Sequence, residues 1–93
     1  MVVRILHEGQ YDVDGQTLDQ LNQLDGQLLD AVSEGDETRF QHLFSQILGL
    51  VRRAGRPLAV EDLRPSELVL PAADSTMEEV RSLLTSEGLI AGM

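Results

Sequence analysis

Apolar and polar residues follow two periods along this chain, close to two residues at its start and about 3.6 residues further on. Residues 2–7 are mostly apolar, and residues 11–14 alternate apolar and acidic side chains, as in a strand with one face in water. Residues 8–10 place a glycine at the centre of a turn between them. We therefore expect an N-terminal β-hairpin. Its inward side chains come from both strands: Val3, Ile5, Tyr11 and Val13.

The first helix is predicted over residues 17–34, where Thr17 and Gln20 have the spacing of a capping box. Gly35 suits the left-handed position that ends a helix. Gly26, inside the helix, costs about 1 kcal/mol relative to alanine. The apolar stripe of this helix consists of Leu18, Leu21, Leu24, Leu28, Leu29 and Val32.

A second helix follows after only Gly35 and Asp36, so the two helices should form an antiparallel hairpin. Asp36 can cap its start, and Gly55 with Pro57 should stop it sharply. Its apolar face covers nearly half of the circumference, so we expect it to touch more than one neighbour. That face consists of Phe40, Leu43, Phe44, Ile47, Leu48, Leu50 and Val51.

Two prolines, Pro65 and Pro71, bracket a short apolar run, and we expect residues 67–70 to form a third strand buried on both faces. Residues 58–64 read as a loop or a single helical turn. A third helix is predicted from residue 76 to about residue 86. We expect Ser75 and Glu78 to form its capping box. Its inward residues should be Met77, Val80, Leu83 and Leu84. Gly88 should end it, followed by Leu89 and Ile90.

These elements predict an α+β fold in a single domain spanning residues 1–93: an N-terminal β-hairpin, an antiparallel helical hairpin, a third short strand and a C-terminal helix. The core is rich in leucine and has only three aromatic residues to draw on, which specifies its shape weakly. A partner or a second copy could therefore add stability, and a homodimer stays open.

Charge is distributed unevenly, with a formal net charge of −9 for the whole chain. Residues 1–38 contain one basic residue, Arg4, against nine acidic ones. Phosphate backbones and anionic lipids repel such a surface, so we expect no nucleic-acid partner and no direct membrane insertion. A basic protein partner fits the charge, although acidic residues can also serve solubility alone. No apolar run approaches roughly 18 residues, and we expect a cytoplasmic protein.

The chain offers no recognisable reaction chemistry, and we expect it not to be an enzyme. It has no cysteine, and His7 and His42 have no second ligand at helical spacing, so no metal site and no cofactor are predicted. Ser66 lies between a proline and an acid without a nearby base, and we expect it to bond local backbone. Glycines are too scattered for a phosphate loop.

Three surface features are left as candidates for recognition. The first is the face of the first helix opposite its apolar stripe, which we take as the expected partner-binding surface: Asp19, Gln23, Gln27, Asp30 and Glu34. The second is the pair Leu48 and Leu50, which exceed what an internal core requires. The third is a basic cluster of Arg52, Arg53 and Arg56, which either neutralises a helix end or reaches anionic lipid or an acidic partner. Asp25 falls within the apolar stripe, and we expect it at the rim of the core, with an arginine partner as the alternative.

Three segments together, residues 1–13, 18–25 and 63–74, resemble PspAA, the small PspA-associated proteins of bacteria and archaea. The most specific parts are Glu8-Gly-Gln-Tyr11 and Pro65-Ser-Glu-Leu-Val-Leu-Pro71. The family pattern has Asp in place of Glu67 and often Pro in place of Ala72. The likeness covers nearly the whole chain in order.

The resemblance implies a companion of phage shock protein A, the coiled-coil, membrane-associated scaffold of the envelope stress response. It would be a non-catalytic accessory protein that binds phage shock protein A and modulates the role of that protein in the envelope stress response. It would reach the inner face of the membrane only through this partner. The family brings no catalytic residues to transfer. The alternative is a stand-alone regulator that senses a small ligand between the hairpin and the helices.

Overall fold

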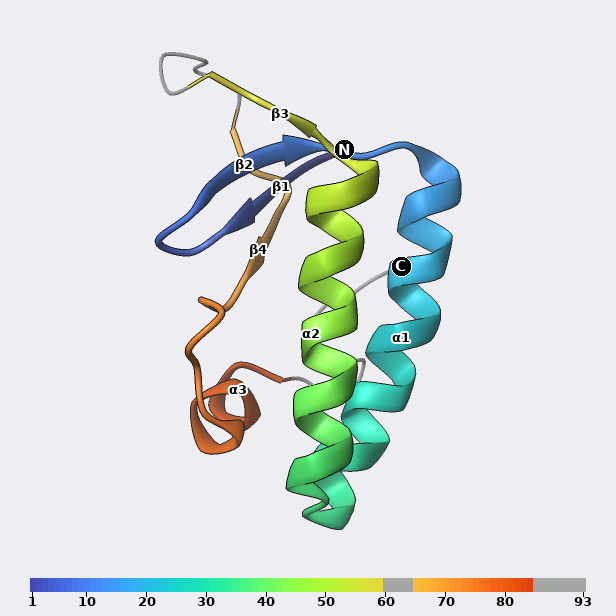
Figure 1. Cartoon of the computed structure of the whole chain (residues 1–93), viewed down its shortest axis with the longest axis vertical. Helices are drawn as coiled ribbons and strands as arrows, with labels where there is room; N and C mark the ends of the chain where they lie inside the picture. The colour runs from blue at the N-terminus through green and yellow to red at the C-terminus, as the bar shows by residue number, and fades with distance from the viewer. Residues whose placement is uncertain (60–64, 85–93) are drawn as a thin grey trace.

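The computed structural model describes residues 1–59 and 65–84. Among them, four strands form one sheet in the order β3-β2-β1-β4, and three helices accompany it. Figure 1 shows α1 (Gly15–Glu34) and α2 (Glu37–Ala54) side by side along the long axis of the molecule. The sheet lies beside the upper half of this helical hairpin and α3 (Met77–Leu83) beside its lower half. The predicted α+β class is confirmed.

The N-terminal β-hairpin is confirmed, but its turn comes earlier than predicted. Strand β1 (Val2–Ile5) pairs antiparallel with β2 (Gly9–Asp12), so the turn comprises residues 6–8. The turn contains His7, whose φ of 66° is in the left-handed region, while Gly9, expected at the centre of the turn, begins β2. The Glu8 N–H then donates to the Ile5 carbonyl at 3.0 Å. Val3 lies opposite Tyr11, as the predicted facing requires.

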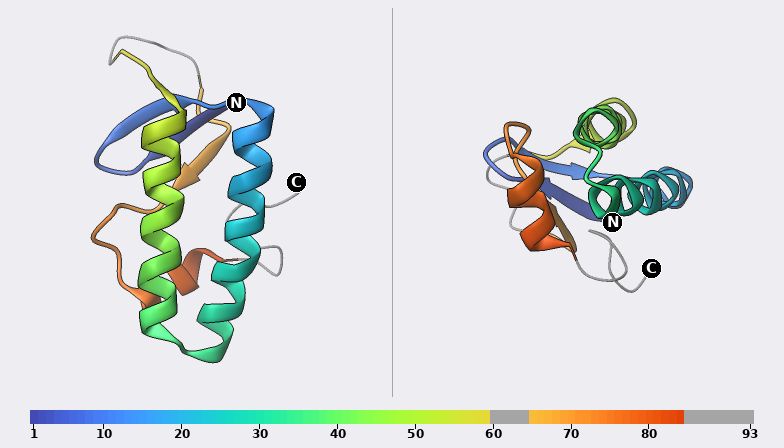
Figure 2. Two further views of the ribbon diagram at one scale, coloured as in Figure 1. Left: turned by 45° about the vertical axis from the view of Figure 1, so that its right-hand side comes forward. Right: turned by 90° about the horizontal axis from the view of Figure 1, so that it is seen from below.

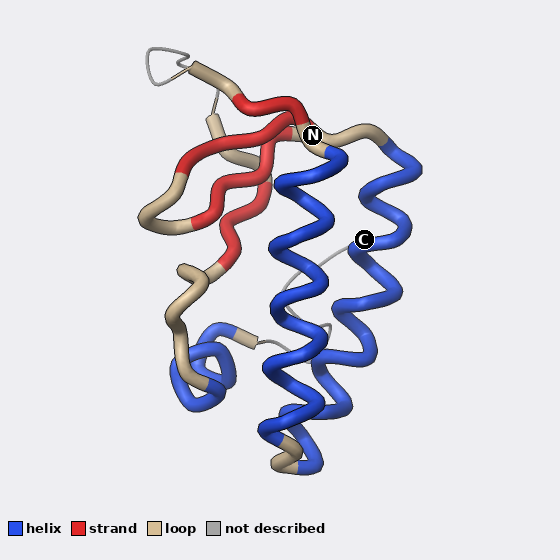
Figure 3. Tube along the Cα trace, viewed as in Figure 1, coloured by secondary structure: helices blue, strands red, loops and turns tan. Residues whose placement is uncertain are grey.

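Helices α1 and α2 form the predicted antiparallel hairpin (Figure 3), and Gly35 ends α1 with a φ of 70°. The predicted capping box at Thr17 was wrong. Asp14 is the N-cap instead, and its carboxylate accepts from the Thr17 N–H at 2.8 Å, so α1 begins two residues earlier. Asp36 caps α2 as expected, accepting from the Arg39 N–H at 3.1 Å.

The two remaining strands lie at the edges of the sheet. Strand β3 (Arg56–Pro57) was not predicted; it directly follows α2 and pairs antiparallel with β2. Strand β4 (Leu68–Leu70) pairs parallel with β1. Its predicted burial on both faces was wrong, because Val69 is 48% exposed while Leu70 is buried. The helices cover only one face of the sheet at this edge strand. Leu70 faces them and is buried, whereas Val69 lies on the opposite, exposed face.

The third helix differs from the prediction by one residue at its start. Thr76 is the N-cap, and it forms a complete capping box with Glu79 in place of the expected Ser75 and Glu78. Met77 and Val80 face inward as predicted, whereas Leu83 is 54% exposed, because this short helix has only one buried side. The expected helix end near residue 86 was wrong, because α3 ends at Leu83 and the backbone is extended at its C-cap, Leu84. The roles given to residues 88–90 lie outside the described residues.

The core is built from side chains of the sheet and of all three helices. Figure 2 shows how these elements are arranged in two further views. Leu48 and Leu50 are both part of the core, so the expectation that they exceed what an internal core requires was wrong. The wide face of α2 is explained by its neighbours, since α2 contacts both α1 and α3. Asp25 is also buried, with 2% of its surface exposed, and therefore does not lie at the rim.

Candidate partner-binding surface

The predicted partner-binding residues of α1 all lie on its exposed side. This follows from the helical period, because the buried Leu21 and Leu28 turn the opposite side of α1 toward the core. The exposed residues in question are Asp19, Gln23, Gln27, Asp30 and Glu34. Glu34 also lies 3.8 Å from Arg39, in an ion pair at the surface. We call these five residues the acidic face of α1.

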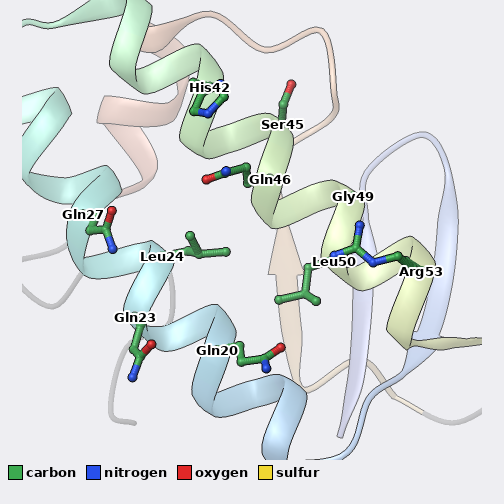
Figure 4. Close-up of a pocket in the computed structure, with 10 residues that line it drawn as sticks. All are labelled: Gln20, Gln23, Leu24, Gln27, His42, Ser45, Gln46, Gly49, Leu50 and Arg53. Carbon is green, nitrogen blue, oxygen red and sulfur yellow. The ribbon is translucent and has the colours of Figure 1, made fainter.

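The structure adds a groove of about 550 Å³ between α1 and α2, which sequence reasoning missed. Figure 4 shows its two walls. Helix α1 contributes Gln20, Gln23, Leu24 and Gln27, and α2 contributes His42, Ser45, Gln46, Gly49, Leu50 and Arg53. Gln23 and Gln27 thus belong to both the acidic face and the groove. The available signal was the spacing of Gln20, Gln23 and Gln27, which repeats at the helical interval beside Leu24.

The chemistry of this groove is that of recognition. Four glutamine amides can each donate and accept hydrogen bonds, and Leu24 and Leu50 add apolar surface between them. Arg53 supplies a positive charge, and none of the described residues that line the groove is a carboxylate. Amide groups beside short apolar stretches suit a polypeptide surface with its own mixture of polar and apolar side chains.

The basic cluster predicted at the end of α2 does not exist as one patch. Arg52 forms an ion pair with Glu8, Arg56 lies 3.6 Å from Asp12, and only Arg53 lines the groove. The three guanidinium groups therefore point to different neighbours. This separation removes the continuous basic surface on which the lipid-binding alternative depended.

The β-turn is tied to α2 through Glu8. Its carboxylate accepts from the Arg52 Nε at 2.8 Å and from the Tyr11 hydroxyl at 2.7 Å, and it also accepts from the second guanidinium nitrogen. The hydrogen bond from Arg52, followed by that from Tyr11, lowers the pKa of Glu8 from 4.5 to about 2. The same contact raises the pKa of Tyr11. This cluster holds the sheet against the carboxyl end of the helical hairpin.

We expect the Glu8 cluster to make stability depend on pH. Because folding lowers the pKa of Glu8, its stabilisation is complete above pH 4.5 and is lost as the pH falls toward about 2. Both partners are partly exposed, so screening limits the effect to about 1 kcal/mol. Urea unfolding of the wild type and of Glu8→Gln should differ by this amount at pH 7 and converge near pH 2. A difference that persists at pH 2 would contradict the assignment.

Ser66 lies within the segment that carried the family resemblance. Its hydroxyl oxygen accepts from the Gln10 side-chain amide at 2.6 Å and from the Arg4 Nε at 3.2 Å, two side-chain contacts that were not predicted. Ser66 therefore joins the segment before β4 to both strands of the hairpin. The part of the sequence most specific to the family serves the sheet here.

Two further properties bear on function. Within residues 1–59 and 65–84, no three histidine or acidic side chains come together in a way that could hold a metal ion. Across the same residues, no helix combines the length and the apolar character needed to span a bilayer.

Comparisons with known proteins give one result. A family model described as PspA-Associated protein matches residues 1–92, almost the full length of the chain. No curated protein and no solved structure matches it.

Proposed function

This chain belongs to the PspA-associated protein family, and we propose that it is a non-catalytic accessory protein that binds phage shock protein A and modulates that protein's part in the envelope stress response. The observation that carries the proposal is the family match over residues 1–92. The groove and the acidic face of α1 support it, because both are surfaces suited to a protein partner.

Charge favours docking through the acidic face of α1. The helix carries no lysine or arginine, and the whole chain has a formal net charge of −9. Carboxylates on an exposed helix attract a basic partner, raise the rate of encounter and disfavour acidic competitors. In this proposal the chain reaches a membrane only through its partner, since its charge is repelled by anionic lipid.

The test is to mix the chain with purified phage shock protein A and to follow the assembly by light scattering and co-elution. Reversing Asp19, Asp30 and Glu34 to arginine should weaken the affinity at least about tenfold, which corresponds to 1.4 kcal/mol. The circular dichroism spectrum should not change, because all three side chains are exposed.

A matched control carries the same change of charge elsewhere. Glu67, Asp74 and Glu78 are also exposed and lie outside α1, so reversing them should leave binding within about twofold. Equal weakening by both triple variants would reject the acidic face as the docking surface. If the unmodified chain forms no complex at all, the proposed function itself is rejected.

A second candidate function is sensing of a small ligand, and the volume of the groove favours it. About 550 Å³ lies within the range of roughly 300–1,000 Å³ that ligand sites occupy. A ligand that binds only the folded state must raise the melting temperature. A thermal-shift screen of metabolites therefore tests this second function. A ligand of the groove should raise the melting temperature of the wild type but not that of Gly49→Ile, and a ligand that raises both does not bind in the groove.

A further inference from the structure

The two walls of the groove have the geometry that helix packing requires. On α1 the lining positions are 20, 23, 24 and 27, and on α2 they continue from 42 to 53 at intervals of three and four. Residues at these intervals form ridges along a helix, and another helix packs into the space between such ridges. From His42 to Arg53 the groove extends for about 16 Å, or three helical turns. Its length therefore fits a short stretch of one further helix.

Gly49 opens the α2 wall of this groove. It is half-buried, yet a Cβ atom built on it would meet nothing within 4 Å. Alanine would fit at this position and would favour the helix by about 1 kcal/mol. A glycine inside a helix that its own fold does not require is typical of a place where another backbone approaches closely.

The charges around the groove indicate which helix would fit. The carboxylates of Asp19, Asp30 and Glu34 lie on α1 but do not line the groove, so they flank it on one side only. Arg53 lies on the opposite wall. The complementary occupant is an amphipathic helix with basic residues on the flank toward α1, small or polar residues facing Gly49, and an acidic residue near Arg53. A second copy of this chain would bring the same acidic flank into contact with itself, which costs free energy.

We propose that the groove between α1 and α2 seats a single basic amphipathic helix of the partner, with its backbone closest at Gly49. This inference rests on the proposed function, because it takes phage shock protein A as the source of the helix. It goes further by naming the groove, and not the acidic face alone, as the seat.

The test replaces Gly49 by isoleucine, whose branched side chain has one strongly preferred rotamer in a helix and cannot swing aside. Ala73→Ile is the control, because it adds the same branched side chain at an exposed position between β4 and α3, outside the groove and outside the acidic face of α1. Both variants keep the charge and should keep the circular dichroism spectrum of the wild type. Gly49→Ile should weaken binding to purified phage shock protein A at least about tenfold, and Ala73→Ile should leave it within about twofold.

A second measurement does not depend on blocking the groove. The chain has no cysteine, so Ser45→Cys places a single thiol on the groove wall and Ala73→Cys places one at an exposed position between β4 and α3. Phage shock protein A should slow alkylation of the thiol at position 45 at least about fivefold more than of the thiol at position 73, because only the first is covered.

The outcomes separate the two proposals. If the unmodified chain and Gly49→Ile bind equally well, or if both thiols react at unchanged rates in the complex, the groove is not the seat although the proposed function stands. If no complex forms, both proposals fail. If light scattering shows a dimer of the unmodified chain that Gly49→Ile dissolves, the groove belongs to a second copy and the inference is overturned.

Discussion

Replacing Phe40 by alanine should lower the free energy of unfolding by about 3–5 kcal/mol, the largest effect that we expect from a single substitution. Phe40 is 2% exposed, and its ring stacks on Phe44 with centroids 5.5 Å apart. Both rings belong to the core cluster that includes Met77 of α3, so truncation leaves a cavity where α2 meets α3. A domain of this size has only about 5–15 kcal/mol in total. Urea unfolding followed by circular dichroism measures the loss.

The control for this prediction is Leu83→Ala. Leu83 is also a large apolar residue, but it is 54% exposed, so its truncation should change stability by no more than about 0.5 kcal/mol. A loss below about 1 kcal/mol for Phe40→Ala would show that this part of the core collapses around the missing ring. It would also weaken the view that α3 is held through the two phenylalanines.

Gly55→Ala is expected to destabilise the chain by about 1–3 kcal/mol, although its backbone conformation is open to any residue. The reason is contact: an added Cβ would lie 2.5 Å from the Val51 carbonyl oxygen and 3.0 Å from the Tyr11 Cβ. Val51 belongs to α2 and Tyr11 to β2, so the carboxyl end of α2 would have to move away from the sheet. Thermal unfolding measures the effect, at about 4–8 °C for each kcal/mol.

The same substitution at Gly26 should have the opposite sign. Its Cβ meets nothing within 4 Å, so alanine there should stabilise α1 by about 1 kcal/mol through helix propensity. Comparing the two variants separates close packing from propensity, because the chemical change is identical. If both variants stabilise the chain, glycine is not required at position 55, where the end of α2 meets β2.

Both substitutions bear on the candidate site. The groove exists only while α1 and α2 keep their separation, and these two helices contact each other directly. The Glu8 contact with Arg52 and the close approach at Gly55 join α2 to the sheet. Phe40 and Phe44 belong to the core cluster that includes Met77 of α3. Loss of either set of contacts should therefore impair partner binding indirectly, which is why the binding tests use positions outside the core.

Much of the fold could be predicted from sequence because its signals are local. The 3.6-residue period located both long helices, and Gly35 and Asp36 set their junction, since a left-handed glycine and a capping aspartate act within one turn. The hairpin turn and two helix starts were misplaced by one or two residues. At these points two nearby residues could fill the same position. Asp14 and Thr17, for example, could both cap α1, and the folded backbone places Asp14 there.

The candidate site could be predicted only in half. The exposure of the acidic face of α1 follows from the helical period of that helix alone. The groove requires the distance between two helices, which the pattern of neither helix contains. The arginines at the end of α2 show the same limit, because Arg52 pairs with Glu8 in the hairpin turn and Arg56 pairs with Asp12 in β2.

The order of residues by itself determined the helices, the hairpin, the family resemblance and the acidic side of α1, because periodicity, capping and charge act over a few residues. Tertiary structure alone decided that β4 lies parallel to β1, that Asp25 and Leu48 are buried, and that Gly49 opens onto a groove. These properties depend on which distant surfaces meet, and that choice is made by packing the whole core at once.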